Sequence, residues 1–456
     1  MSLELANKRV LVVGLGKSGL AAAHFLRARG ARVTVSDARP ATLIAELPML
    51  LDEGFMVEAG SHGLLTFRRQ DLIVVSPGVP ANVPELVKVR ALGMRIIGEL
   101  ELGAQFLAGE VLAITGSNGK TTTTTLVGEI LKASGRPTLV GGNIGRPVVD
   151  MADEATADTW SVLEVSSFQL ETIEEFRPKI AVVLNITPDH LDRHGSFENY
   201  AAAKARITEN QTPEDYLVLN AEDVPTQLVA SRTKAQIYWF SAKRQIKQGA
   251  FVRGETIFFT AKEGGKPEPV MPVAEIPLAG AHNVENVCAA ICSAKLAGVS
   301  SETIRAAVSV FKAVEHRLEF VRELDGVRYY NDSKATNVDA TVKAVEAFPG
   351  NIHLILGGKD KNSDYAVMGS LLQERVKTVI TIGSAAEKIE QQLAGVVKIE
   401  RAETIDRAVT WAREHAASGD VVLLAPACAS FDQFENYEHR GRVFKHLVQE
   451  LNSSRN

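Results

Sequence analysis

The chain has 456 residues, of which 45% are hydrophobic and 23% are charged, and its formal net charge is -5. This composition excludes an intrinsically disordered chain, and the slightly acidic charge excludes a globally basic nucleic-acid-binding surface. Only three cysteines are present. None has zinc-finger spacing, so the pattern excludes a disulfide-built scaffold and favours core thiols in a reducing compartment.

The length predicts about three domains, at roughly 150 residues each. No apolar run reaches the roughly 18 to 20 residues that a membrane helix needs, so we expect no membrane span. At the N-terminus, Lys8 and Arg9 precede an apolar run that glycines interrupt from Gly14 onward. This pattern favours a strand, a turn and a helix over a signal peptide, and we therefore expect a cytoplasmic protein.

Short apolar runs alternate with amphipathic, alanine-rich stretches along most of the chain. Buried strands are predicted at 10–13, 32–36, 72–75, 111–115, 160–165, 180–186, 352–356, 377–382 and 420–425. Helices are predicted at 18–29, 122–134, 284–297, 301–312, 337–347 and 402–417. Strands that alternate with helices indicate an α/β protein with parallel sheets and helices on both faces.

Two changes of pattern divide the chain, one near residue 98 and one near residue 313. The predicted domains are therefore 1–98, 99–313 and 314–456. Residues 237–278 differ from the rest of the middle domain, because they are rich in aromatic and β-branched residues, glycine and proline. We predict short antiparallel strands there, at the edge of that domain.

The first predicted strand is followed by Gly14-x-Gly16-x-x-Gly19, and Asp37 ends the next predicted strand. This arrangement is typical of dinucleotide-binding turns, in which the glycines let the backbone approach a diphosphate and the acid meets a ribose or a base. The pattern does not specify the nucleotide. A close-packed strand–helix turn without a ligand is the alternative.

A second glycine-rich turn follows the predicted strand at 111–115 and consists of Gly116, Ser117, Asn118, Gly119, Lys120, Thr121 and Thr122. Its backbone N–H groups and the N-terminus of the following helix predict a phosphate site. Lys120 can reach the outer phosphates, and the Thr121 hydroxyl suits Mg²⁺. The standard pattern has a further glycine where Ile114 stands, so this turn is a shortened form. A plain strand-to-helix turn is the alternative.

Polar residues follow two more predicted strands of the middle domain. Glu164 lies near the end of the strand at 160–165, and His190 follows the strand at 180–186. The carboxyl edge of a parallel sheet is where α/β proteins hold their ligands. Glu164 suits Mg²⁺, which prefers oxygen donors, whereas His190 is a less usual ligand and an ordinary hydrogen-bonded histidine is the alternative.

The C-terminal domain has three polar segments, at 331–337, 356–361 and 427–434, and two of them directly follow predicted strands. Lysines and hydroxyls that converge where buried strands meet loops would suit a small dicarboxylate or a phosphate. For each segment taken singly, solvated loop residues are the alternative.

Together, and in this order, the motifs resemble the Mur ligases of peptidoglycan synthesis over nearly the whole chain. The likeness rests on segments 14–19, 76–80, 115–121, 142–145, 164–170, 189–194 and 331–337, on His282, Asn283 and Asn286, and on His316 and Arg317. Segment 331–337, with Gly357, Gly358 and Lys361, looks like the family members that add D-glutamate. Lys17-Ser18 and Lys359-Asp360 depart from the family forms without removing a role-bearing residue.

The resemblance implies three α/β domains: a Rossmann-like N-terminal domain, a P-loop-type central ATPase domain and a Rossmann-like C-terminal domain that holds the incoming amino acid. It assigns the first glycine-rich turn to UDP rather than to NAD. The implied contacts to UDP-N-acetylmuramoyl-L-alanine are Gly14, Leu15, Lys17, Ser18, Asp37, Arg39, Ser76, Pro77, Gly78 and, for the muramoyl part, Asn143.

For ATP, the resemblance implies the turn from Gly116 to Thr122 with Asn283, Asn286, Arg317 and Asp332. It also implies two Mg²⁺ ions, whose ligands would come from Thr121, Glu164, His190 and Lys204, the last carbamylated by CO2. Carbamylation turns a cation into an anionic oxygen donor. The implied catalytic residues are Lys120, Glu164, His190 and Lys204, and the implied D-glutamate contacts are Lys334, Thr336, Lys361, Ser430, Phe431 and Tyr437.

The implied reaction is ATP-dependent amide formation through an acyl phosphate. A related Mur-type or folylpolyglutamate-like ligase with another acceptor is the alternative within this class. An NAD-linked oxidoreductase would leave Lys120 and Glu164 without a role, and a non-catalytic UDP-sugar-binding protein would not need Lys204. We expect no nucleic-acid or membrane partner and, because the chain has no heptad pattern or apolar surface stripe, a monomer.

Overall fold

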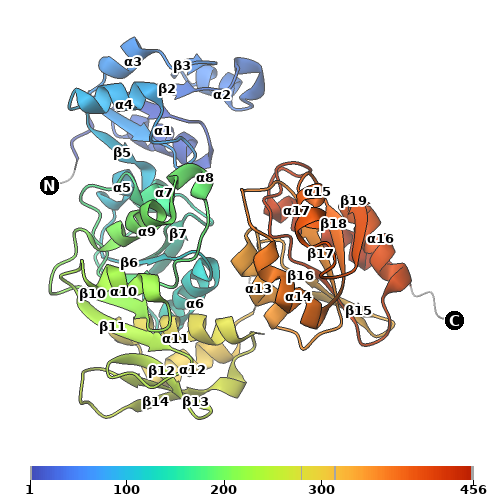
Figure 1. Ribbon diagram of the computed structural model, residues 1–456. Helices are drawn as coiled ribbons and strands as arrows, with labels where there is room; N and C mark the ends of the chain where they lie inside the picture. Colours follow the sequence, from blue (N-terminus) through green and yellow to red (C-terminus); the bar gives the residue numbers. More distant parts are fainter. Residues whose placement is uncertain (1–2, 279, 313–314, 453–456) are drawn as a thin grey trace. The chain divides into compact units, whose positions relative to one another are not determined.

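The computed structural model describes residues 3–278, 280–312 and 315–452. These residues form three sheets and two compact units (Figure 1). Unit 1 comprises Met1–Ile186, Glu198–Met271 and Cys288–Ala307, and unit 2 comprises Thr187–Phe197, Pro272–Val287 and Val308–Asn456. The predicted α/β class with three sheet-containing parts is confirmed. The boundary predicted at residue 313 lies outside the described residues, and the domain limits stay predictions.

The first sheet has five parallel strands in the order β3-β2-β1-β4-β5. The strands are β1 (Arg9–Val13), β2 (Arg32–Asp37), β3 (Met56–Ala59), β4 (Leu72–Val75) and β5 (Ile96–Gly98), with helices α1 (Lys17–Ala28), η1 (Ala41–Leu43), α2 (Leu47–Asp52), α3 (Leu64–Arg68), α4 (Pro84–Ala91) and α5 (Glu99–Ala104). Val10 and Val12 pack into one core cluster, whereas Leu11 and Val13 pack into another. Both faces of the sheet are therefore covered.

The second sheet has nine strands in the order β14-β13-β12-β11-β10-β9-β6-β8-β7. The strands are β6 (Glu110–Thr115), β7 (Thr138–Gly142), β8 (Trp160–Glu164), β9 (Ile180–Val183), β10 (Tyr216–Asn220), β11 (Gln236–Ser241), β12 (Gly249–Arg253), β13 (Thr256–Thr260) and β14 (Glu268–Pro272). The helices from this stretch of chain are α6 (Lys120–Ala133), η2 (Val148–Met151), α7 (Ser167–Leu170), α8 (Leu191–His194), α9 (Phe197–Ala205), η3 (Arg206–Thr208), α10 (Val224–Ala230), η4 (Val273–Glu275), α11 (Ala281–Leu296) and α12 (Ser301–Ser309). Because β6 lies between β8 and β9, the turn that follows it is flanked by two other strand ends.

The segment 237–278 corrects one prediction. Strands β12 and β13 are antiparallel, as predicted, but β11 runs parallel to both β10 and β12. The prediction of antiparallel strands throughout this segment is therefore wrong for β11. A parallel pair requires a connection that runs back along the sheet, and residues 242–248 make this return. Apolar and β-branched patterning indicates a strand but does not fix its direction.

The third sheet has six strands in the order β15-β16-β20-β17-β18-β19, and its β15–β16 pair is antiparallel. The strands are β15 (Glu319–Leu324), β16 (Val327–Asn331), β17 (Ile352–Gly357), β18 (Val376–Ile382), β19 (Ile399–Glu403) and β20 (Val421–Leu424), with helices α13 (Val338–Glu346), η5 (Ala366–Met368), α14 (Gly369–Arg375), α15 (Ala386–Gln392), α16 (Ile405–His415) and α17 (Tyr437–Glu450). The helix predicted at 402–417 begins only at Ile405, because the residues before it complete the edge strand β19.

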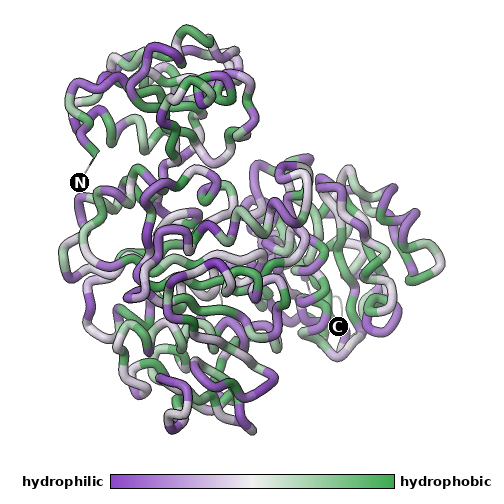
Figure 2. Tube along the Cα trace, turned by 60° about the vertical axis from the view of Figure 1, so that its left-hand side comes forward, coloured by the Kyte–Doolittle hydropathy of each residue, from purple (hydrophilic) through white to green (hydrophobic). Residues whose placement is uncertain are grey.

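The apolar strands form the interior of each unit. Figure 2 shows hydrophobic stretches running through the sheets and hydrophilic stretches at the outer loops. All three cysteines are buried and lie outside any disulfide, which confirms the prediction of core thiols. Within the described residues, no helix has both the length and the apolar character that a membrane crossing requires.

Candidate active site

The first glycine-rich turn joins β1 to α1 and packs tightly on the end of β4. Gly14 has a φ of +90°, in the region that favours glycine, and a Cβ at Gly19 would collide with the carbonyl oxygen of Gly14. The Ser76 hydroxyl donates to that same carbonyl at 2.9 Å. The predicted segments 14–19 and 76–78 therefore lie together at the carboxyl ends of neighbouring strands.

Asp37 and Arg39 shape this turn. One oxygen of Asp37 accepts the N–H of Leu15 at 2.7 Å, and Arg39 donates to both oxygens, each at 2.9 Å. Desolvation of the buried Asp37 would raise its pKa, but the hydrogen bonds from Arg39 and Leu15 outweigh it, and the pKa lies below its ordinary value. Asp37 and Arg39, both predicted contacts to the UDP-linked substrate, thus form an ion pair directly beside the glycine turn.

The second glycine-rich turn joins β6 to α6. Gly119 has a φ of +84° and is the N-cap of α6, whose first residue is Lys120. The Lys120 ammonium donates to the carbonyls of Gly116 and Ser117, both at 2.8 Å. Asn185 holds the turn from the neighbouring strand end, because its side-chain oxygen accepts the N–H of Asn118 at 2.8 Å. Sequence reasoning did not include Asn185 in the site.

Glu164 connects residues from two separate motifs. Its carboxylate is fully buried and accepts from the Thr121 hydroxyl at 2.6 Å and from the Asn143 amide at 2.8 Å. Thr121 and Glu164, both predicted metal ligands, are therefore in contact. Asn143, the predicted muramoyl contact, is hydrogen-bonded to the same Glu164 carboxylate. A hydroxyl and a carboxylate side by side offer the oxygen donors that Mg²⁺ prefers, so these two residues fit the implied metal.

Lys204 reaches the same turn from α9. Its side chain is only 1% exposed, and its ammonium donates to the Gly116 carbonyl at 2.7 Å and lies 4.6 Å from the ring centre of Tyr200. The Tyr200 hydroxyl is 2.9 Å from the Ser117 hydroxyl. An ammonium offers no lone pair, so Lys204 fits the role of a metal ligand only as a carbamate, which keeps one N–H for the Gly116 carbonyl.

His190 belongs to unit 2, where it is the N-cap of α8 and has a φ of +52°. Its ring nitrogen lies 3.7 Å from an oxygen of Asp189. Asp189 also accepts from the Asn337 amide at 3.0 Å and lies 3.5 Å from the Lys361 ammonium. Asp189, which sequence reasoning gave no role, thus links the predicted metal ligand His190 to the predicted D-glutamate contact Lys361.

The remaining predicted ATP residues gather in unit 2. Asn286 donates to Asn283 at 3.1 Å, and both are buried. Burial, with the positive charges of Lys343 and Arg317, lowers the pKa of the neighbouring His282 to about 4. Burial also raises the pKa of Asp332 to about 6, against the opposing charge of Arg317.

The predicted D-glutamate residues lie on three loops of unit 2, except Tyr437, which is the first residue of α17. The Lys334 ammonium is 5.0 Å from the ring centre of Tyr437, and Ser430 is buried. Phe431 is 67% exposed. The third predicted loop, which carries Lys361, is joined to residues 427–430 by two backbone hydrogen bonds between Lys359 and Ala429.

Arg440, which sequence reasoning missed, fixes two of these loops. Its guanidinium is fully buried on α17 and donates to the carbonyl and hydroxyl of Ser333 at 2.8 and 3.0 Å. It also donates to the carbonyl of Cys428 at 3.2 Å from both terminal nitrogens, and to that of Ala429. Burial lowers the pKa of Arg440 to about 10. Nothing in the sequence marks this arginine, because its helix is amphipathic and rich in charge.

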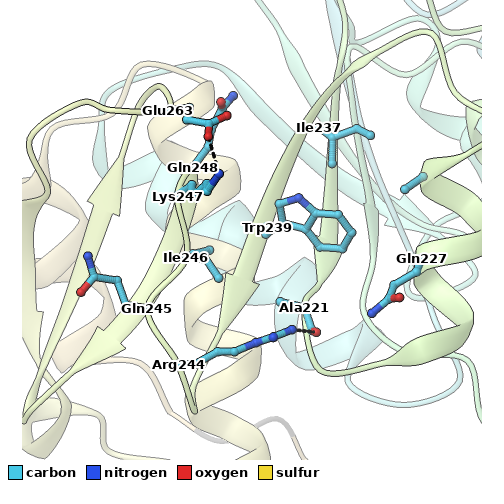
Figure 3. A pocket seen from close by; sticks show the side chains of 11 residues that line it. Ala221, Gln227, Ile237, Trp239, Arg244, Gln245, Ile246, Lys247, Gln248 and Glu263 are labelled. Carbon is cyan, nitrogen blue, oxygen red and sulfur yellow. Dashed lines mark hydrogen bonds and ion pairs between the residues drawn. The ribbon is translucent and has the colours of Figure 1, made fainter.

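A separate hollow of about 600 Å³ lies on the nine-stranded sheet, over Trp239 of β11 (Figure 3). The return connection 242–248 and α10 form much of its wall. Its rim charges are already paired, since Lys247 contacts Glu263 at 2.7 Å and Arg244 contacts Glu222 at 3.0 Å. None of the predicted site residues lines it.

Three family models of known proteins match successive parts of the chain. Residues 8–98 match the model of the Mur ligase MurD-like N-terminal domain, residues 114–294 that of the Mur ligase middle domain, and residues 316–428 that of the Mur ligase glutamate ligase domain. A protein of Acidobacterium capsulatum named UDP-N-acetylmuramoylalanine–D-glutamate ligase is 65% identical over 447 residues, which cover 98% of this chain and 97% of that protein. The chain belongs to the Mur ligase family.

Two further relatives agree with this assignment. A protein of the same name from Koribacter versatilis is 60% identical to this Mur ligase, over 98% of this chain and 99% of that protein. The solved structure of the UDP-N-acetylmuramate-alanine ligase MurC from Thermotoga maritima has a TM-score of 0.61 at 20% identity and covers 97% of this chain and 99% of that chain. The last likeness shows that the fold is shared.

Proposed function

We propose that this Mur ligase joins D-glutamate to UDP-N-acetylmuramoyl-L-alanine with hydrolysis of ATP, in peptidoglycan precursor synthesis. The observation that carries the proposal is the cluster at the second glycine-rich turn, where the half-buried Lys120 of the turn lies with the buried side chains of Glu164 and Lys204. Relatives that bear the name of this activity and are 60–65% identical over nearly the whole chain support the choice of substrates.

In the proposed reaction, the alanine carboxylate of the UDP-linked substrate attacks the γ-phosphorus of ATP, and ADP leaves. The resulting acyl phosphate is attacked at its carbonyl carbon by the amine of D-glutamate, and inorganic phosphate leaves as the amide forms. Lys120 and the backbone N–H groups at the start of α6 would neutralise phosphate charge, which is the main contribution that a protein makes to phosphoryl transfer.

We further propose that Thr121 and Glu164 hold Mg²⁺, with Lys204 as a carbamate and His190 as additional ligands. Bound Mg²⁺ would supply charge neutralisation between the two anionic reactants. Protein incubated with ¹³C-bicarbonate should give a carbamate NMR signal that is lost in Lys204→Arg. Failure of the wild-type protein to give that signal would contradict the carbamate but not the ligase reaction.

The amino-acid acceptor is assigned to Lys334, Thr336, Lys361, Ser430, Phe431 and Tyr437, and UDP to the residues around the first glycine turn. These assignments rest on the family resemblance and on the convergence of loops that Arg440 connects. We place the reaction in the cytoplasm because ATP and a UDP-linked substrate are cytoplasmic compounds. We also propose that the protein is a monomer.

The deciding experiment measures phosphate release from ATP and Mg²⁺ with UDP-N-acetylmuramoyl-L-alanine and one acceptor at a time: D-glutamate, L-glutamate, L-alanine or a diamino acid. Release that requires both the UDP substrate and D-glutamate is the expected result. Release with a different acceptor would preserve phosphoryl transfer and refute the assignment of the acceptor. No release with any acceptor would refute the ligase proposal.

A further inference from the structure

Four side chains form a polar network beneath the predicted D-glutamate loops. We call Asp360, Tyr365, Lys388 and Cys428 the Asp360 network. The Tyr365 hydroxyl donates to one oxygen of Asp360 at 2.8 Å, and the Lys388 ammonium donates to the other at 2.7 Å. On its other side, the Tyr365 hydroxyl lies 3.0 Å from the sulfur of Cys428. Tyr365 and Cys428 are both fully buried.

The network connects three separate elements of unit 2. Asp360 follows strand β17, Lys388 lies on α15, and Cys428 follows strand β20. Asp360 also accepts the N–H of Ser363 at 3.1 Å, which closes the loop around it. The backbone N–H of Tyr365 donates to a side-chain oxygen of Gln392 at 2.8 Å, so the tyrosine is fixed at both its backbone and its hydroxyl.

The direction of the hydrogen bonds follows from the protons available. Desolvation opposes ionisation of Asp360, but hydrogen bonds from Lys388 and Tyr365 lower its pKa below the ordinary value, so its carboxylate can only accept. The Tyr365 hydroxyl must therefore donate to Asp360, which leaves its oxygen free to accept from the thiol. Burial raises the pKa of Cys428 to about 11, so the thiol keeps the proton that it donates.

The two ends of the network adjoin predicted ligand residues. Asp360 immediately precedes Lys361, and Cys428 lies two positions before Ser430 in the chain. The Cys428 carbonyl is also the point at which Arg440 binds this loop. A displacement of Tyr365 would therefore change the spacing between the loop of Lys361 and the loop of Ser430.

We propose that Tyr365 is a positioning residue for the amino-acid acceptor, which holds the Lys361 loop against the Ser430 loop through Asp360 and Cys428. The inference rests on the proposed function of this site. Tyr365 is fully buried and needs no contact with the acceptor for this role; it acts through the two loops that its hydroxyl connects. Its removal should therefore weaken acceptor binding while leaving ATP and the UDP-linked substrate largely unaffected.

The test is Tyr365→Phe, with Tyr329→Phe as a matched control. Tyr329 is equally buried, in β16 of the same unit, and its hydroxyl has no hydrogen-bond partner among the described residues. Loss of one buried hydrogen bond to a charged group should raise KM for D-glutamate by roughly tenfold in Tyr365→Phe. The KM values for ATP and the UDP substrate should change by less than about twofold, and the control should match the wild type.

A second pair of variants tests the other end of the network. Cys428→Ser keeps an O–H donor to Tyr365 and should retain most of the affinity for D-glutamate, whereas Cys428→Ala should raise its KM by about threefold or more. Thermal unfolding of every variant identifies any that is simply misfolded. Because serine and alanine both remove the sulfur, their difference reports the hydrogen bond rather than the volume.

Three results have distinct meanings. A rise in KM for D-glutamate alone, with rescue by serine at position 428, supports the positioning role. A Tyr365→Phe enzyme that matches the wild type, or one in which kcat and every KM worsen together, overturns it. Wild-type protein that releases no phosphate with D-glutamate would refute the proposed function, and the positioning role would be refuted with it.

Discussion

Glu99 and Glu101 lie two residues apart on α5, and both are completely buried. Glu101 accepts three backbone N–H groups, from Glu174, Glu175 and Phe176, at 2.8 to 3.0 Å. Glu99 accepts the N–H of Val149 at 2.9 Å, and its other oxygen has no hydrogen-bond partner among the residues that the structure describes. Desolvation consequently raises the pKa of Glu99 to about 7, against the opposing backbone hydrogen bonds from Val149 and Val148.

The consequence is a pH-dependent stability. Because the folded-state pKa of Glu99 is above its ordinary value of 4.5, the folded protein retains a proton that the unfolded chain has lost. Its stabilising contribution is fully present below about pH 4.5 and is lost as the pH rises through about 7. The rise from 4.5 to about 7 corresponds to about 3 kcal/mol of unfolding free energy, at roughly 1.4 kcal/mol per pKa unit.

Glu99→Gln should remove this dependence, because an amide does not titrate. We would follow urea unfolding of the wild type and the variant by tryptophan fluorescence at about pH 5, 7 and 8, and compare the change in unfolding free energy with pH. Glu101→Gln is the control, and it should be destabilised at every pH because three N–H groups lose a carboxylate acceptor. Identical pH slopes for Glu99→Gln and the wild type would refute the reasoning.

Two further substitutions test the site. Lys120→Ala should lower ATP-dependent phosphate release by at least about a hundredfold, since the charge of Lys120 would face the phosphates. Lys132→Ala, on the exposed face of the same helix, should leave the release unchanged. Equal activities of the two variants would contradict the phosphate assignment. Arg440→Lys should lower the free energy of unfolding by about 2 kcal/mol or more, because one ammonium cannot satisfy the acceptors on Ser333, Cys428 and Ala429. Arg442→Lys, at an exposed position of the same helix, serves as the control. An Arg440→Lys protein as stable as the wild type would show that these acceptors find other donors.

The buried strands were predictable because parallel sheets covered on both faces produce continuous apolar runs. The run at 72–75, for example, coincides with β4. Strands β7 and β10 were not predicted, since Gly141 and Gly142 weaken the first pattern and a tyrosine and an asparagine bound the second. The sequence did not predict the direction of β11 for a different reason. Whether two strands pair parallel or antiparallel depends on the path of the connection between them rather than on the residues of the strands.

The two glycine-rich turns were also predictable, together with Lys120 in the second turn and Asp37 beside the first, because their chemistry depends on short spacings in the sequence. The meeting of Asn143 with Glu164 was not, because it depends on the pairing of β7 with β8. Asn185, Tyr200 and Arg440 carry no motif of their own. Their importance comes from burial and hydrogen bonding to backbone carbonyls, N–H groups or hydroxyls from distant parts of the chain, which only the folded structure reveals.

The sheet of unit 2 has a consequence for how new substrate preferences can arise. Every residue of β17 and β20 is buried, with side chains packed alternately into two separate cores. A one-residue slip in either strand would exchange the contents of both cores, so these strands have little freedom to vary. The loops that begin after Gly357 and Leu424 start buried, but at 359–364 and 431–436 they are exposed or half-buried, and there the constraint is absent. Selection for a different acceptor can therefore act on these loops while the scaffold beneath them stays unchanged.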